Sequence, residues 1–126
     1  KPGLDQNFKY YRKQAMQLAS KMRFVSAQFL AYIDQEIWKE NATHANRMAQ
    51  LLYNELKGIK GIEITQKTLA NGVFAIVPKE IIPVLQEKFF FYVWDEDRGE
   101  VRWMTSWDTQ ESDIKSFTGL IRSLLR

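Results

Sequence analysis

The feature that most constrains the fold is a change in the spacing of apolar residues near Gly58 and Gly61. Before these glycines, apolar side chains recur every three or four residues, which predicts helices. After them, residues 62–65 alternate and residues 72–77 form a short apolar run, and both patterns predict strands. Because the helical and strand-like parts are separated along the chain, the sequence predicts an α+β fold.

Residues 1–58 are expected to form a helical connecting segment. The spacing predicts a loop over residues 1–7 and three helices: one from Phe8 to about Met22, one over residues 24–33, and one from an Asp34 N-cap to Lys57. One side of the first helix is apolar, with Phe8, Tyr11, Ala15, Leu18 and Met22. Its other side is basic, with Lys9, Arg12, Lys13 and Lys21. Exposed Lys and Arg are normally solvated, and the alternative is that this face binds an anion.

Residues 59–126 are expected to form an α/β sandwich within a single domain covering residues 1–126. Strands are predicted over residues 62–65, 72–77, 90–94 and 100–107, and helices over about ten residues from Pro78 and over residues 109–125. The resulting order β-β-α-β-β-α is typical of a small, mostly antiparallel sheet backed by helices on one face.

The predicted strand around Arg102 carries a charge between tryptophans. Alternation places Val101, Trp103, Thr105 and Trp107 on one side and Arg102, Met104 and Ser106 on the other. Two interpretations of Arg102 remain open from these residues alone. It is either a solvated residue on the polar face of a sheet or a guanidinium that binds a carboxylate in a bidentate way. After the strand, Asp108 and Glu111 predict a capping box for the last helix.

Composition excludes several kinds of function. The chain has no cysteine, so thiolate metal sites and a Cys nucleophile are absent, and a reducing, cytoplasmic location is expected. A formal net charge of +3, with acids and bases interspersed, argues against a nucleic-acid partner, and no apolar run is long enough to span a membrane. The sequence contains no nucleophile motif and no Gly-rich phosphate loop, and its lone His44 predicts a hydrogen-bonding residue rather than a metal site. By its residues alone, the chain is an α+β module and not a self-contained enzyme.

Four segments nevertheless resemble a known family when they are taken together. They are Arg12-Lys13 with Lys21-Met22-Arg23, Asn41-Ala42-Thr43-His44-Ala45-Asn46, Ala70-Asn71-Gly72-Val73-Phe74, and Val101-Arg102-Trp103-Met104-Thr105-Ser106-Trp107-Asp108. In this order they resemble the C-terminal part of threonine aldolases, which are pyridoxal-phosphate enzymes of the β-eliminating lyase group with the aspartate-aminotransferase fold (fold type I). The resemblance implies a small C-terminal domain of a larger enzyme that cleaves L-threonine or L-allo-threonine to glycine and acetaldehyde. It also implies a parent that is a homo-oligomer, a dimer or tetramer, with an amino-acid substrate.

The resemblance assigns roles to particular residues. Arg102 resembles the arginine that binds the substrate's α-carboxylate. Arg23 resembles an arginine near the cofactor phosphate that is approached across a subunit interface, and Lys13 resembles a cofactor-site lysine at the mouth of the active site. The lysine that forms the Schiff base with pyridoxal phosphate would lie upstream of Lys1, so no catalytic residue is expected in this chain. Ser106 stands where many relatives have His, and no role is assigned to it.

Two alternatives remain. One is another lyase of the same superfamily, acting on an aromatic or sulfur-containing amino acid. The other is a free-standing α+β module that binds a ligand or a protein. The apolar stripes of the first helices are expected to be covered by a large domain or a second subunit, and an isolated fragment is expected to pair through Phe8, Tyr11, Phe24 and Phe29.

Overall fold

In the computed structural model, which describes residues 3, 5–16 and 19–126, the chain forms two units, Lys1–Trp38 and Lys39–Arg126. The division lies earlier in the chain than the boundary at residue 58 expected from the change in spacing. The reason is that α3 (Ile37–Leu56) buries its apolar stripe in the core of the second unit.

The first unit contains α1 (Phe8–Gln14) and α2 (Met22–Asp34), and none of the described residues of these two helices is buried. Asp34 is the last residue of α2, so its predicted role as an N-cap of the next helix is wrong. Helical hydrogen bonding continues through it to Gln35, and Glu36, at a φ of 53°, turns the chain into α3. Leu18 of the predicted apolar stripe and residues 1, 2 and 4 of the predicted loop lie outside the described residues.

The second unit is built on a four-stranded antiparallel sheet with the strand order β1-β2-β4-β3. The strands are β1 (Glu63–Ile64), β2 (Gly72–Ile76), β3 (Tyr92–Asp95) and β4 (Glu100–Met104). Between β2 and β3 the chain forms the short 3-10 helix η1 (Lys79–Ile81) and α4 (Ile82–Gln86), and α5 (Glu111–Leu124) follows β4. The α+β class and the order β-β-α-β-β-α are therefore confirmed.

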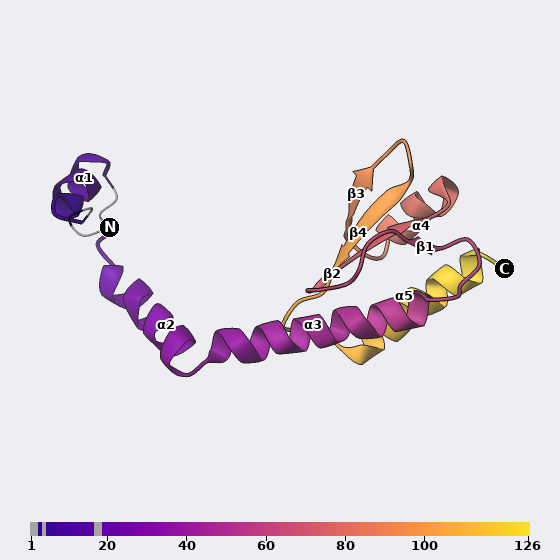
Figure 1. Ribbon diagram of the computed structural model, residues 1–126, viewed down its shortest axis with the longest axis horizontal. Helices are drawn as coiled ribbons and strands as arrows, with labels where there is room; N and C mark the ends of the chain where they lie inside the picture. Colours follow the sequence, from indigo (N-terminus) through magenta and orange to yellow (C-terminus); the bar gives the residue numbers. More distant parts are fainter. Residues whose placement is uncertain (1–2, 4, 17–18) are drawn as a thin grey trace. The chain divides into compact units, whose positions relative to one another are not determined.

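One face of this sheet forms the core. Alternate residues of the two central strands are buried, namely Val73, Ala75, Val101 and Trp103. They form one apolar cluster with residues of α3 and α5 that include Leu52, Leu56, Ile114, Phe117 and Ile121. Figure 1 shows α3 and α5 on the same side of the sheet, and Arg122 of α5 donates hydrogen bonds to the carbonyl and carboxylate of Glu55 in α3 at 2.8 and 2.6 Å. The helices thus back one face, and the side chains that alternate with the core residues occupy the opposite face.

The segment that leaves β4 differs from the prediction. The strand ends at Met104, and Trp107, predicted to lie on the same side of the strand as the buried Trp103, is 67% exposed. Thr105 is the last residue of the alternation that faces inward, and its buried hydroxyl donates to the carbonyl of Ala45 in α3 at 2.7 Å. Ser106 and Asp108 are hydrogen-bonded to one another in the following turn, so Asp108 does not cap α5.

The capping box of α5 lies two residues later than predicted. Gln110 precedes the helix, and its backbone N–H donates to the carboxylate of Asp113 at 2.8 Å. The strand expected from Phe90 begins at Tyr92, and α4 is shorter than the ten residues predicted. Pro83 lies at the start of α4, where its missing N–H leaves no helical hydrogen bond unmade. Among the helices of the described residues, none has the length and apolarity needed to cross a membrane.

Candidate functional site

Arg102 lies at the centre of the open face of the sheet. Its strand β4 is paired on both sides, so that Phe74 of β2 and Tyr92 of β3 lie directly opposite Arg102. Because alternate residues of a strand point to opposite faces, Arg102 points away from the buried Val101 and Trp103. The side chain of Arg102 is half-buried. It lies on the side of the strand opposite Val101 and Trp103, as the alternation predicts.

Two aromatic rings hold the guanidinium of Arg102. Its central carbon lies 4.8 Å from the centroid of the Trp94 ring and 5.6 Å from that of Tyr92. The Trp94 ring in turn meets Phe74 edge-on, with centroids 5.4 Å apart. A β-bulge between Val93 and Asp95 leaves Trp94 without a residue directly opposite it in β4. Trp94 follows Tyr92 by two residues, and Tyr92 is the residue of β3 that pairs with Arg102.

No acid within the described residues forms an ion pair with Arg102. The nearest acid along the strand, Glu100, is buried and accepts a hydrogen bond from the Thr65 hydroxyl, while Arg98 lies 3.8 Å from its other oxygen. The Nε atom of Arg102 is buried and has no hydrogen-bond partner within the described residues. A guanidinium with this environment can bind an added carboxylate through its outer nitrogens in the forked geometry that Arg favours.

Arg23 and Lys13 belong to the first unit, whereas Arg102 belongs to the second. Arg23 is the second residue of α2, is exposed, and lines a hollow with Ser20, Lys21, Phe24 and Ala27. The first turn of this helix carries no acid, and its backbone amides add to the positive potential there. Lys13 is exposed in the last turn of α1 and is not among the residues that line this hollow.

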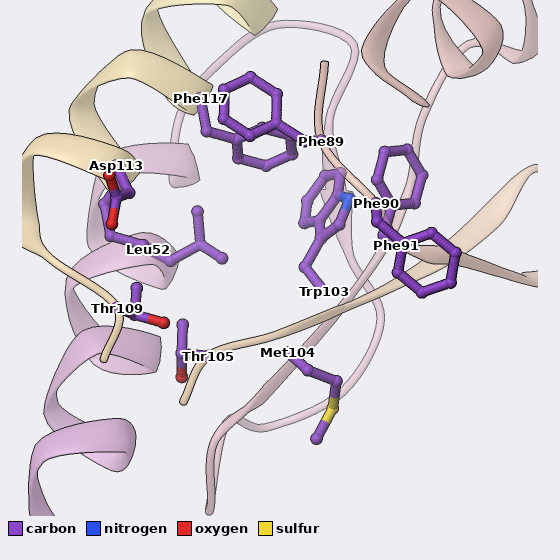
Figure 2. A pocket seen from close by; sticks show the side chains of 11 residues that line it. Leu52, Phe89, Phe90, Phe91, Trp103, Met104, Thr105, Thr109, Asp113 and Phe117 are labelled. Atoms are coloured by element: carbon purple, nitrogen blue, oxygen red, sulfur yellow. The ribbon is translucent and has the colours of Figure 1, made fainter. Parts of the chain in front are cut away.

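A separate pocket of about 130 Å³ opens beside Trp103 (Figure 2). Its walls come from α3, α5, the end of β4 and the segment before β3, and they are mostly apolar: Leu52, Phe89, Phe90, Phe91, Trp103, Met104, Thr105, Thr109, Asp113, Ile114 and Phe117. Asp113 is the one charged residue among the described residues that line it, so the pocket is unsuited to a carboxylate or phosphate. Sequence reasoning missed it because its walls come from segments far apart in the chain; the run Phe89-Phe90-Phe91 was the available signal.

His44 has the structural role that the sequence predicts. Its Nε2 lies 2.8 Å from the carbonyl of Thr109, and this contact joins α3 to the turn before α5. Arg47 approaches Nδ1 at 3.4 Å. Within the part of the chain that the structure describes, no group of three or more His, Cys, Asp or Glu residues is arranged to hold a metal ion.

Fold and site together define a small α+β domain that presents an aromatic-bound arginine on the open face of an antiparallel sheet. Over 122 residues, 97% of the chain, it is 37% identical to the low specificity L-threonine aldolase of Pseudomonas sp. (strain NCIMB 10558) and 34% identical to that of Pseudomonas aeruginosa. A solved structure of Leishmania major threonine aldolase matches 66% of the chain with a TM-score of 0.59 and 28% sequence identity. No protein-family model matches the chain.

The family resemblance seen in the sequence is thereby confirmed, and the chain is consistent with a small domain of a threonine aldolase. The chain spans about a third of the length of the curated relatives it matches, 35% in each case. It covers 25% of the Leishmania major chain.

Proposed function

We propose that this chain is the C-terminal small domain of a pyridoxal-phosphate-dependent aldolase that cleaves L-threonine or L-allo-threonine to glycine and acetaldehyde, and that Arg102 binds the α-carboxylate of the substrate. The observation that carries the role of Arg102 is its position on the open sheet face, between aromatic rings and without an acid partner in the described residues. The similarity to low specificity L-threonine aldolases over 97% of the chain supports the activity of the parent protein.

The contribution of Arg102 to such a reaction is orientation. Pyridoxal phosphate supplies the electron sink for cleavage at the α-carbon when it is bound. A carboxylate held in two places by a guanidinium cannot rotate freely, so the arginine fixes which bond of the α-carbon is aligned for cleavage. Because β4 is paired on both sides, this anchor sits on a rigid element.

Arg23 and Lys13 are the residues we assign to the cofactor. The hollow beside Arg23 fits a phosphate chemically, since Lys21, Arg23 and Ser20 line it and none of the described residues that line it is an acid. Lys13 adds a further exposed positive charge from α1, close to Arg23 in sequence. The lysine that would hold the cofactor is expected from the part of the parent upstream of Lys1, and we assign to this chain residues that bind substrate and cofactor.

Homo-oligomeric assembly of the parent and a cytoplasmic location complete the proposal. The exposed apolar side chains of α1 and α2 support assembly, because large apolar surfaces on soluble proteins are normally covered. The absence of cysteine is compatible with the cytoplasm.

The test is substitution of Arg102 in the full-length parent enzyme. For Arg102→Ala we expect the KM for threonine to rise about 10- to 100-fold, since a hydrogen bond to a charged group contributes roughly 1.5–3 kcal/mol. The cofactor absorbance should be unchanged, because Arg102 is not assigned to the cofactor. Arg102→Lys should recover only part of the loss, since an ammonium cannot make the fork. Unaltered kinetics of Arg102→Ala would remove the residue from this role.

The free-standing binding module is the alternative that the comparisons do not favour. The parent reading frame distinguishes it, since a cofactor lysine encoded shortly upstream of Lys1 supports the enzyme. A substrate panel that includes aromatic and sulfur-containing amino acids separates an aldolase from another lyase of the superfamily.

A further inference from the structure

The contacts of Arg102 single out a second residue of the open sheet face. Trp94 lies closer to the guanidinium than Tyr92 does, at 4.8 Å against 5.6 Å from the ring centroids. Trp94 is itself supported by Phe74, whose ring it meets at an interplanar angle of 84°. The guanidinium therefore has aromatic contacts supplied by β3, and Phe74 supports the closer one from β2.

An arginine side chain without such contacts would occupy many rotamers. Arg guanidinium groups stack on aromatic faces, and Trp gives the strongest attraction of this kind. Contact with Trp94 and Tyr92 removes part of this freedom before any ligand arrives, so less conformational entropy is lost when a carboxylate binds.

The burial of Nε decides which nitrogens of Arg102 meet the carboxylate. The Nε atom is buried and has no hydrogen-bond partner within the described residues, so an incoming ligand cannot reach it. The two terminal nitrogens remain, and they form an end-on fork. A carboxylate bound there would approach along the axis of the side chain rather than from its flank.

We propose that Trp94 is a positioning residue for the substrate carboxylate: with Tyr92 it holds the guanidinium of Arg102 so that its two terminal nitrogens face the ligand. This inference rests on the carboxylate-binding role proposed for Arg102. Trp94 does not itself contact the reacting atoms. Its effect on the substrate passes through Arg102.

The experiment uses the full-length parent enzyme and measures KM and kcat for threonine. Trp94→Leu is expected to raise KM about fivefold with little change in kcat. A change in KM of about fivefold corresponds to the loss of one cation–π contact at an exposed site. Trp94→Phe, which keeps an aromatic face, should recover at least half of this effect. Trp107→Leu is the matched control, because Trp107 is also an exposed tryptophan, at 67% against 54% for Trp94, and has no ring contact with Arg102 in the structure.

A double substitution separates positioning from general stability. In an Arg102→Ala background, Trp94→Leu should raise KM no further, because the residue it positions is gone. An equal rise in both backgrounds would overturn the inference, as would an unchanged KM for Trp94→Leu beside a raised KM for Arg102→Ala. Thermal unfolding of each variant shows whether the enzyme is still folded. Tyr92→Leu provides a second variant should Trp94→Leu not fold, and it is expected to raise KM about twofold.

The two proposals fail in distinguishable ways. An unchanged KM for Arg102→Ala would remove the carboxylate role of Arg102 and the positioning role of Trp94 together. A raised KM for Arg102→Ala with no effect of Trp94→Leu would remove only the positioning role of Trp94.

Discussion

Three arginines of the second unit show how the surroundings decide what a guanidinium does. Arg122 binds Glu55 at 2.6 Å and joins α5 to α3, and Arg98 lies 3.8 Å from the buried Glu100. Arg102 contacts aromatic rings instead of an acid. A cation that stacks on rings keeps its hydrogen-bonding capacity, whereas Arg122 already donates hydrogen bonds to Glu55.

Arg23 is the residue whose cofactor role can be tested directly. In the parent enzyme, Arg23→Ala removes one positive charge at the start of α2, and we expect about tenfold weaker retention of pyridoxal phosphate, because a phosphate prefers charge-assisted donors. Cofactor absorbance after dialysis measures this.

Lys115→Ala is the control for Arg23→Ala, since Lys115 is an exposed base on α5 that does not line the hollow beside Arg23. The same measurement on Lys13→Ala tests the second cofactor assignment. Full retention by Arg23→Ala would contradict the role proposed for it.

At the scale of the elements, the turn from β3 to β4 depends on Gly99. Its φ is 67°, and a Cβ atom placed there would lie 2.8 Å from the carbonyl oxygen of Val77. We expect Gly99→Ala to lower the free energy of unfolding by about 2–4 kcal/mol, because it combines strain in a left-handed conformation with a clash against backbone. Urea unfolding of the chain measures the change.

Gly58 provides the matched control for Gly99. Its φ is 87°, but a Cβ atom added to it would have no neighbour within 4 Å. Gly58→Ala should therefore lower the free energy of unfolding only through backbone strain, by about 1 kcal/mol. Equal losses at the two glycines would show that the contact with Val77 does not matter.

The element boundaries show what local sequence can and cannot predict. Alternation over residues 100–104 was sufficient to place Arg102 on the face opposite Trp103, because the side-chain period of a strand is fixed. The aromatic partners of Arg102 were not predictable, since they depend on strand register and on the bulge in β3. The capping roles of Asp34 and Asp108 were wrong because Asp favours caps in general, while the turns at Glu36 and at residues 106–109 decide where each helix begins.

At the scale of the whole molecule, α1 and α2 expose several large apolar side chains. Phe24 is 71% exposed and Phe29 is 62% exposed. We predict that the 126-residue chain self-associates through these residues, and that Phe24→Ser with Phe29→Ser weakens association at least tenfold, or roughly 1.4 kcal/mol.

Sedimentation equilibrium measures this association. Leu69→Ser is the control, because Leu69 is 76% exposed but belongs to the second unit. A wild-type chain that remains monomeric at high concentration would refute the prediction.

The position of β4 inside the sheet also has a consequence for hydrogen exchange. The backbone amides of β4 pair with β2 on one side and β3 on the other, while its inner face packs on the apolar cluster. Amides of this kind exchange with deuterium only when the surrounding structure opens globally. We therefore expect Arg102 to lie in the slowest-exchanging segment of the unit, and on warming the carboxylate binding proposed for it should disappear in the same transition that melts the sheet.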